Sequence, residues 1–222
     1  MIRLYHCMSA RSFRALWALE ELMLPFEVIM LPFPPRVHDR TFLDLNPLGT
    51  IPLLVHGNTR MTESAAICQY LCSLCRPTPM QVEPGEPDYG DYLNMLHFGE
   101  ATLTFPQTLV LRYSFFEPEE KRVPSVAGDY AKWFLARLRT LESRLAEDEY
   151  LCAGRFTAAD ISVGYALMLA EYLGLAPRFT ASVAAYWQRL QRRDAFIRAL
   201  KVQDTAATAQ GISLTPAPLS AH

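Results

Sequence analysis

The stretch Gly49-Thr50-Ile51-Pro52-Leu53-Leu54 decides the fold of this chain, together with the nearby Thr62-Glu63-Ser64-Ala65-Ala66-Ile67. Residues 51–56 have the apolar composition of a buried strand, but proline cannot donate a hydrogen bond to a β ladder. Pro52 therefore belongs at the start of the strand. A cis peptide bond before Pro52 would turn the N–H and C=O of Ile51 outward, toward a peptide-like ligand. The alternative is an ordinary proline that only begins a strand.

The second stretch predicts a helix that starts at Glu63 and Ser64, after a short hairpin. Unpaired N–H groups and the positive end of the helix dipole gather at such a start, so a ligand carboxylate can be held there. The Ser64 hydroxyl would be a further donor, and Glu63 could accept from a ligand ammonium. The alternative is that Thr62, Glu63 and Ser64 only cap the helix. Taken together, the two stretches indicate a site for a peptide-like thiol.

Hydrophobic periodicity predicts the elements around these stretches. Residues 2–6 and 26–31 have the pattern of short buried strands, and the segment between them has apolar residues at helical spacing. This βαβ unit implies two parallel strands with a right-handed crossover. A short helix over about 39–44 is expected to follow, and then the hairpin and the helix 63–74.

Proline spacing divides the chain into predicted domains. We expect a first domain over residues 1–76 and a proline-rich linker over 77–88, because prolines interrupt both helix and sheet there. Residues 89–202 have helical periodicity throughout, which indicates an all-helical domain. Residues 203–222 are rich in Ala, Thr, Ser and Pro, a composition that predicts a poorly ordered tail.

The overall composition excludes several classes of function. A net charge of −2 over 222 residues gives no basic surface for nucleic acid or acidic lipid. No apolar run is long enough for a membrane span, and the N-terminus has no secretory pattern. Five cysteines are too few for a disulfide scaffold and favour a reducing compartment.

Three separated motifs resemble those of cytosolic glutathione S-transferases over residues 1 to about 202. They are the Pro52 and Ser64 region described above, the segment 4–14 (Leu-Tyr-His-Cys-Met-Ser-Ala-Arg-Ser-Phe-Arg), and the segment 156–161 (Phe-Thr-Ala-Ala-Asp-Ile). The last segment matches the family's capping box and hydrophobic staple. The resemblance implies an α+β thioredoxin-like domain followed by an all-α bundle. It also implies a cytoplasmic homodimer in detoxification, with glutathione as cosubstrate and no metal.

The chemistry is expected in the loop after the first strand. A free thiol has a pKa near 8.5, so a transferase gains by stabilising the thiolate. Ser9 lies five residues before Arg14, the spacing of the catalytic serine in the serine-type classes that this chain resembles. Ser12 competes for the same role, and Tyr5 is a third candidate. Arg11 lies where the family can place a residue against glutathione, with an exposed turn charge as the alternative.

The chain departs from the family at two points. The loop lacks the Ser-Ser-Cys run of the zeta class. It also lacks the cysteine that the thiol-reductase classes have two residues after the position of Ser9. Cys68, Cys72 and Cys75 share one helical face, but a single C-x-x-C at a helix C-terminus is a poor redox or metal site. The class of transferase is therefore left open.

A pocket for the second substrate is expected from aromatic and methionine side chains, which suit an apolar electrophile. The candidates are Met8, Phe98, Phe105 and Tyr113, each of which could equally be a core residue. The predicted function is addition of the glutathione thiolate to an apolar electrophile or peroxide, with Ile51 and Pro52 binding the cysteinyl part and Glu63 and Ser64 the γ-glutamyl end. The alternative is a non-catalytic protein of the same fold that binds a ligand or partner.

Overall fold

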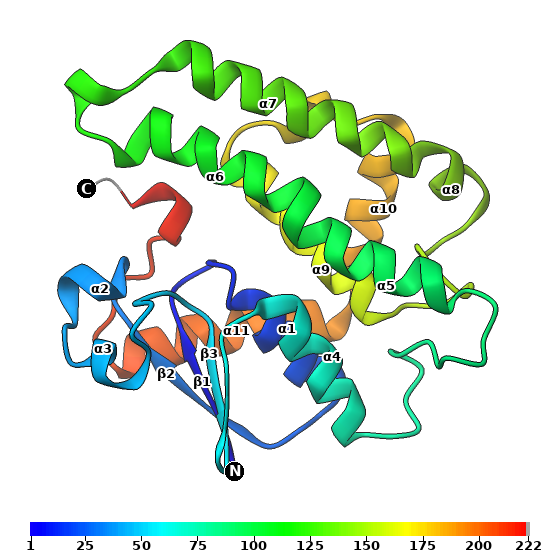
Figure 1. Ribbon diagram of the computed structural model, residues 1–222, viewed down its shortest axis with the longest axis horizontal. Coiled ribbons are helices and arrows are strands. Elements are labelled where there is room, and N and C mark those ends of the chain that lie inside the picture. Colours follow the sequence, from blue (N-terminus) through cyan, green and yellow to red (C-terminus); the bar gives the residue numbers. More distant parts are fainter. Residues whose placement is uncertain (221–222) are drawn as a thin grey trace. The chain divides into compact units, whose positions relative to one another are not determined.

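The computed structural model describes residues 1–220 and divides into two compact units (Figure 1). The first unit comprises residues 1–76 and 192–220, and the second comprises residues 77–191. The first unit thus includes a C-terminal segment that the composition had assigned to a helical domain and a poorly ordered tail.

The first unit is a four-stranded mixed sheet covered by helices. Its strands are β1 (Ile2–His6), β2 (Phe26–Met30), β3 (Leu53–His56) and β4 (Thr59–Met61), in the spatial order β2-β1-β3-β4. Its helices are α1 (Phe13–Glu21), α2 (Pro35–His38), α3 (Phe42–Leu45), α4 (Ser64–Leu74) and α11 (Asp194–Ala209). Strands β1 and β2 are parallel and joined through α1, which confirms the predicted βαβ unit.

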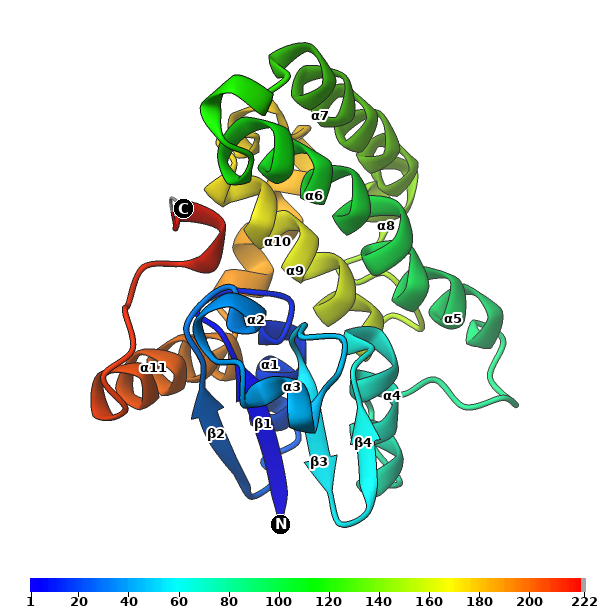
Figure 2. The ribbon, with the colours of Figure 1, turned by 60° about the vertical axis from the view of Figure 1, so that its left-hand side comes forward.

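Successive side chains along the strands point to opposite faces of the sheet and form two apolar layers. Tyr5 and Leu53 face α3, where the Tyr5 and Phe42 rings lie 5.7 Å apart. Leu4 and Leu54 are register partners and are fully buried on the opposite face. Figure 2 shows α2 and α3 on one side of the sheet and α1 and α4 on the other.

Helix α11 extends seven residues beyond residue 202, the predicted end of the helical domain. Ala199, Gln203 and Ala207 continue its buried face at helical spacing. Ala207 packs against Met8 of the loop after β1 and Met30 of β2. Tertiary packing therefore orders a segment whose composition alone suggested a tail.

The second unit is all-helical. It contains α5 (Tyr89–His97), α6 (Phe105–Leu111), α7 (Pro124–Leu138), α8 (Glu142–Glu147), α9 (Ala158–Tyr172) and α10 (Ala181–Gln191). Two π-helical stretches follow α5 and α6, at Phe98–Thr104 and Arg112–Phe116. Pro106 lacks an N–H and cannot complete the ladder of the preceding turn, which accounts for the first of these stretches.

Helix α9 forms the centre of this unit. The Asp160 carboxylate accepts from the Thr157 N–H at 2.8 Å, which confirms the predicted capping box. The other carboxylate oxygen accepts from Leu151 N at 3.0 Å and from the Tyr186 hydroxyl at 2.8 Å. The box therefore also ties α9 to α10 and to the loop before it.

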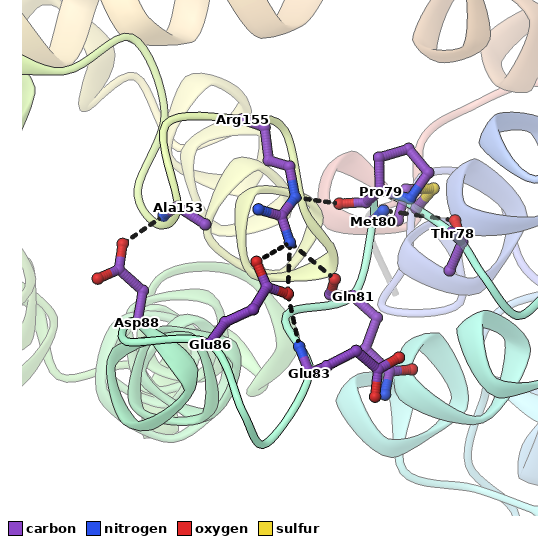
Figure 3. Close-up of polar contacts among 9 residues, drawn as sticks. All are labelled: Thr78, Pro79, Met80, Gln81, Glu83, Glu86, Asp88, Ala153 and Arg155. Atoms are coloured by element: carbon purple, nitrogen blue, oxygen red, sulfur yellow. Dashed lines mark hydrogen bonds and ion pairs between the residues drawn. The ribbon is translucent and has the colours of Figure 1, made fainter.

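The proline-rich segment predicted as a linker is part of the second unit and is hydrogen-bonded to residues 153 and 155, just before α9 (Figure 3). The Arg155 guanidinium donates to the Pro79 and Gln81 carbonyl oxygens at 2.9 and 3.2 Å, and to both Glu86 carboxylate oxygens at 2.8 Å. Asp88 accepts from the Ala153 N–H at 2.6 Å. A single arginine thus holds several backbone groups of a segment that cannot form helix or sheet bonds.

Candidate functional site

Three predicted site segments meet at one end of the sheet. Because β3 runs antiparallel to β1, with Tyr5 opposite Leu53, the loop after β1 lies beside the start of β3. Because β4 runs antiparallel to β3, with Leu54 opposite Met61, the end of β4 lies at the same edge. The sheet register therefore gathers residues 7–12, 51–52 and 62–64, which are far apart in the sequence.

The loop between β1 and α1 is held by its own backbone. Ala10 N–H donates to the Cys7 carbonyl at 3.1 Å, and Phe13 N–H donates to the Ala10 carbonyl at 2.8 Å. The Ser12 hydroxyl accepts from Cys7 N–H at 3.4 Å and is fully buried. Ser12 therefore has a structural contact within the loop.

Ser9 stands at the bend of this loop, with a left-handed φ of 52° that is uncommon for a residue other than glycine. Two hydrogen bonds join Ser9 to Gln203 of α11. Ser9 N–H donates to Gln203 Oε1 at 3.0 Å, and Gln203 Nε2 donates to Ser9 Oγ at 3.2 Å. Ser9 is only 1% exposed. Ser9 is therefore almost inaccessible to solvent in this structure.

His6 completes the same network. Its Nε2 lies 3.0 Å from Gln203 Oε1, and the ring is fully buried. Burial lowers the pKa of His6 to about 4, against a smaller opposing effect of the hydrogen bond to Gln203. His6 is thus neutral near pH 7.

Arg11 and Tyr5, the other candidates near Ser9, differ in their location and burial. Arg11 lies in the loop and is half-buried. Tyr5 lies within β1 and is 8% exposed, packed in the apolar cluster with Phe42 and Leu53. Tyr5 and Ser9 are therefore both buried, and burial alone does not separate these two candidates.

The segment before β3 turns sharply at Gly49. Gly49 has φ of 61°, and a Cβ there would lie 2.7 Å from Arg36 Cβ, so only glycine fits without displacement. The Ile51–Pro52 peptide bond is cis, as the sequence suggested. Pro52 is buried, and the half-buried Ile51 packs against the cluster that contains Cys7 and Ala10.

The start of α4 is supported from behind by Arg14. Glu63 occupies the N-cap position in extended conformation and is exposed, whereas Ser64 is 3% exposed. Arg14 Nη1 donates to Ser64 Oγ at 3.2 Å, and Arg14 itself is fully buried. This contact fixes the orientation of Ser64 relative to α1.

Sequence reasoning missed a contact from the C-terminal strap, which we define as residues 212–220. Ala217 N–H donates to the Met8 carbonyl at 2.7 Å. The Ala217 side chain is buried in the cluster with Cys7 and Ala10, where Ile51 also packs. The strap thus contacts two of the three segments of the candidate site.

Comparison with known proteins identifies the family. The family model for the N-terminal domain of glutathione S-transferase matches residues 8–74. The chain is 30% identical over 226 residues to glutathione S-transferase 3 of Zea mays, an alignment that covers 96% of this chain and 95% of the maize protein. This chain belongs to the cytosolic glutathione S-transferase family.

Solved structures share the fold of this chain. A glutathione transferase from Methylococcus capsulatus superposes with a TM-score of 0.82 at 24% identity, covering 92% of this chain and all of that one (100%). The glutathione transferase URE2P6 from Phanerochaete chrysosporium, solved in complex with oxidized glutathione, has a TM-score of 0.77 at 26% identity and covers 92% of this chain and 97% of that one. The predicted thioredoxin-like domain and helical domain are therefore confirmed.

The residues expected to line a second-substrate pocket of this family member belong to different units. Met8 is 4% exposed and packs on Met30 and Ala207 within the first unit. In the second unit, Phe98 and Tyr113 are half-buried and Phe105 is 54% exposed. The pocket itself stays a prediction.

All five cysteines are free thiols, and four of them are buried. Cys68 and Cys72 are buried thiols whose pKa values burial raises, Cys68 to about 12. Within residues 1–220, no cluster of three His, Cys, Asp or Glu side chains is arranged to hold a metal ion. In the same range no helix is long and apolar enough to cross a membrane.

Proposed function

We propose that this protein is a glutathione transferase that adds the glutathione thiolate to an apolar electrophile. The supporting observation is the convergence of the Ser9 loop, the Ile51–Pro52 segment and the start of α4 at one end of the sheet. The relative URE2P6, which was solved with oxidized glutathione, supports glutathione as the thiol.

Each segment would bind a different part of the tripeptide. The main chain of Ile51 would pair with the cysteinyl residue, and Pro52 would shape that edge. The start of α4 would hold the γ-glutamyl end, with its carboxylate at the helix N-terminus and its ammonium near Glu63. Arg11 would lie against the bound peptide.

The chemistry requires a stabilised thiolate. The glutathione thiol gives its proton to water, and hydrogen bonding from the Ser9 hydroxyl lowers the free energy of the resulting anion. The sulfur electron pair then forms a C–S bond while the bond from carbon to its leaving group breaks. With a peroxide, sulfur attacks oxygen, the O–O bond breaks, and glutathione sulfenic acid and an alcohol are formed. Binding contributes proximity and orientation to either reaction.

The second substrate would be a small apolar molecule in contact with Met8, Phe98, Phe105 and Tyr113. By analogy with the family, the protein would act as a cytoplasmic homodimer in detoxification. These assignments rest on family membership and on the apolar chemistry of the four side chains.

One observation favours a second candidate, a non-catalytic glutathione-fold protein that binds a ligand or a partner. Ser9 is 1% exposed and its hydroxyl accepts from Gln203. If the Ser9 hydroxyl does not contact the sulfur, the protein would keep its fold and its binding surface but would not catalyse the reaction.

Turnover of an electrophile panel by the wild type, Ser9→Ala and Ser12→Ala separates these functions. The proposal expects conjugation by the wild type, a loss on the order of 100-fold in Ser9→Ala, and a much smaller loss in Ser12→Ala. Glutathione binding without turnover in the wild type would favour the non-catalytic protein. Unchanged turnover in Ser9→Ala would remove Ser9 from the mechanism.

A further inference from the structure

Gln203 makes a buried polar contact that local packing does not require. Its side chain projects from α11 and is 2% exposed, with its neighbours Ala199 and Ala207 on the same face also buried. A buried carboxamide is costly unless it is hydrogen-bonded. An apolar residue would continue the face at lower cost, so the carboxamide calls for an explanation.

The contacts of Gln203 fix the orientation of its amide. Ser9 N–H is always a donor, so the atom 3.0 Å from it is the carbonyl oxygen Oε1. The opposite atom is then Nε2, which donates to Ser9 Oγ at 3.2 Å. That contact uses a lone pair of the hydroxyl, so the hydroxyl proton points away from Gln203.

The same assignment fixes the tautomer of His6. Oε1 can only accept, so His6 Nε2, 3.0 Å away, carries the proton. The network of His6, Gln203 and Ser9 therefore consists of neutral groups with defined donor directions. It holds the Ser9 backbone in its left-handed conformation as well as the hydroxyl.

We propose that Gln203 is a positioning residue for the transferase reaction: it orients the Ser9 amide and hydroxyl so that the hydroxyl proton is directed toward the sulfur of bound glutathione. This inference rests on the proposed function. It predicts that Gln203 acts on the acidity of the bound thiol, through Ser9, more than on the affinity for glutathione.

Gln210, the residue directly after α11, provides a matched control for Gln203. Its carboxamide accepts from Met30 N–H at 2.8 Å and donates to the Val28 carbonyl at 2.9 Å. Gln210 therefore joins the end of α11 to strand β2 through two backbone contacts, and neither of them involves Ser9. Gln210→Met should reproduce any purely structural effect of losing such a carboxamide.

The test is the pKa of the bound glutathione thiol, measured from the ultraviolet absorbance of the thiolate as a function of pH. We would compare the wild type, Gln203→Met, Gln210→Met, Ser9→Ala and the double variant Ser9→Ala with Gln203→Met. We expect Gln203→Met to raise the thiol pKa by about one unit, and to lower kcat about tenfold below that pKa. The KM for glutathione should change less than about threefold. Gln210→Met should leave the thiol pKa unchanged.

The double variant separates positioning from folding. If Gln203 acts through Ser9, the double variant has the same thiol pKa as Ser9→Ala alone. An unshifted pKa in Gln203→Met, or an additional equal shift in the Ser9→Ala background, would overturn the inference while leaving the proposed function intact. If Ser9→Ala itself does not shift the pKa, the proposed role of Ser9 fails first.

A second substitution covers the case in which Gln203→Met does not fold. Gln203→Glu keeps the shape and can accept from Ser9 N–H and His6, but its carboxylate cannot donate to Ser9 Oγ and would attract the hydroxyl proton to itself. We expect a larger rise of the thiol pKa than in Gln203→Met. A thiol pKa at or below the wild-type value in Gln203→Glu would contradict the inference.

Discussion

Arg14 Nη1 donates a hydrogen bond of 3.2 Å to Ser64 Oγ, and both side chains are buried. The bond joins the helix that follows the Ser9 loop to the start of the helix proposed to hold the γ-glutamyl carboxylate. A buried cation thus stands directly behind the proposed anion site.

Arg14→Met should therefore weaken both stability and ligand binding. Loss of a hydrogen bond from a charged donor is expected to lower the free energy of unfolding by about 2–3 kcal/mol, as measured by urea denaturation. Glutathione affinity should fall because Ser64 is no longer oriented. Arg60→Met is the control, since exposed Arg60 donates only to the Leu45 carbonyl, at 3.3 Å. Equal effects of the two substitutions would contradict the role of Arg14.

The C-terminal strap is expected to restrict access to the proposed site. Ala217 donates to the Met8 carbonyl and is buried beside Ala10. A chain that ends at Gln210 keeps α11 and the contacts of Gln203. Its affinity for glutathione, measured by calorimetry, should rise on the order of tenfold if one such contact must be broken for binding. Leu219→Ser, a change at a side chain that is 51% exposed, is the control. An unchanged or lower affinity of the shortened chain would show that the strap does not limit binding.

Asp160 should make the stability of the protein depend on pH. Burial raises the pKa of Asp160 to about 6, although four hydrogen bonds oppose the shift. The folded state therefore binds more protons than the unfolded state, in which an aspartate has a pKa near 3.9. This contribution to stability is fully present below about pH 4 and is lost as the pH rises through about 6.

The difference in unfolding free energy between the wild type and Asp160→Asn isolates this contribution. We expect it to become less favourable to the wild type by about 2 kcal/mol between roughly pH 4 and pH 7. Urea denaturation across this range measures it. A difference that is constant, or that increases with pH, would mean that the hydrogen bonds outweigh burial.

Cys75 should react first with an alkylating reagent. It is the half-buried member of the five free cysteines, and the other four are buried. Burial raises the pKa values of Cys7 and Cys152 to about 12, and that of Cys72 also rises, so their thiolate fractions at pH 8 are very small. Mass spectrometry after brief treatment with iodoacetamide should find the label on Cys75. Preferential labelling of Cys7 or Cys72 would reopen a redox role.

The sequence predicted those features that depend on local chemistry. Pro52 marked a strand start because proline cannot donate to the ladder. Ser64 marked a helix start, and Thr157 with Asp160 marked a second one, because capping needs particular side chains at fixed spacing.

The features that could not be predicted from the sequence depend on contacts between residues far apart in the chain. Gln203 and Ser9 are separated by 194 positions, and Ala217 lies in a segment whose composition resembles a disordered tail. One usable signal was the spacing of Phe196, Ala199, Gln203 and Ala207, which continues the buried face of α11. No local pattern indicated that Arg155 would fasten the proline-rich segment, because its partners are backbone carbonyl groups.

Residues 7–12, 51–52 and 62–64, at one end of the sheet, are proposed to bind glutathione. Calorimetric titration of the purified full-length protein with reduced glutathione tests this proposal most directly. The account predicts saturable binding of one glutathione per chain, weakened in Arg14→Met and preserved in Arg60→Met. Absence of binding up to millimolar glutathione would contradict this claim and leave the fold of the family without its binding site.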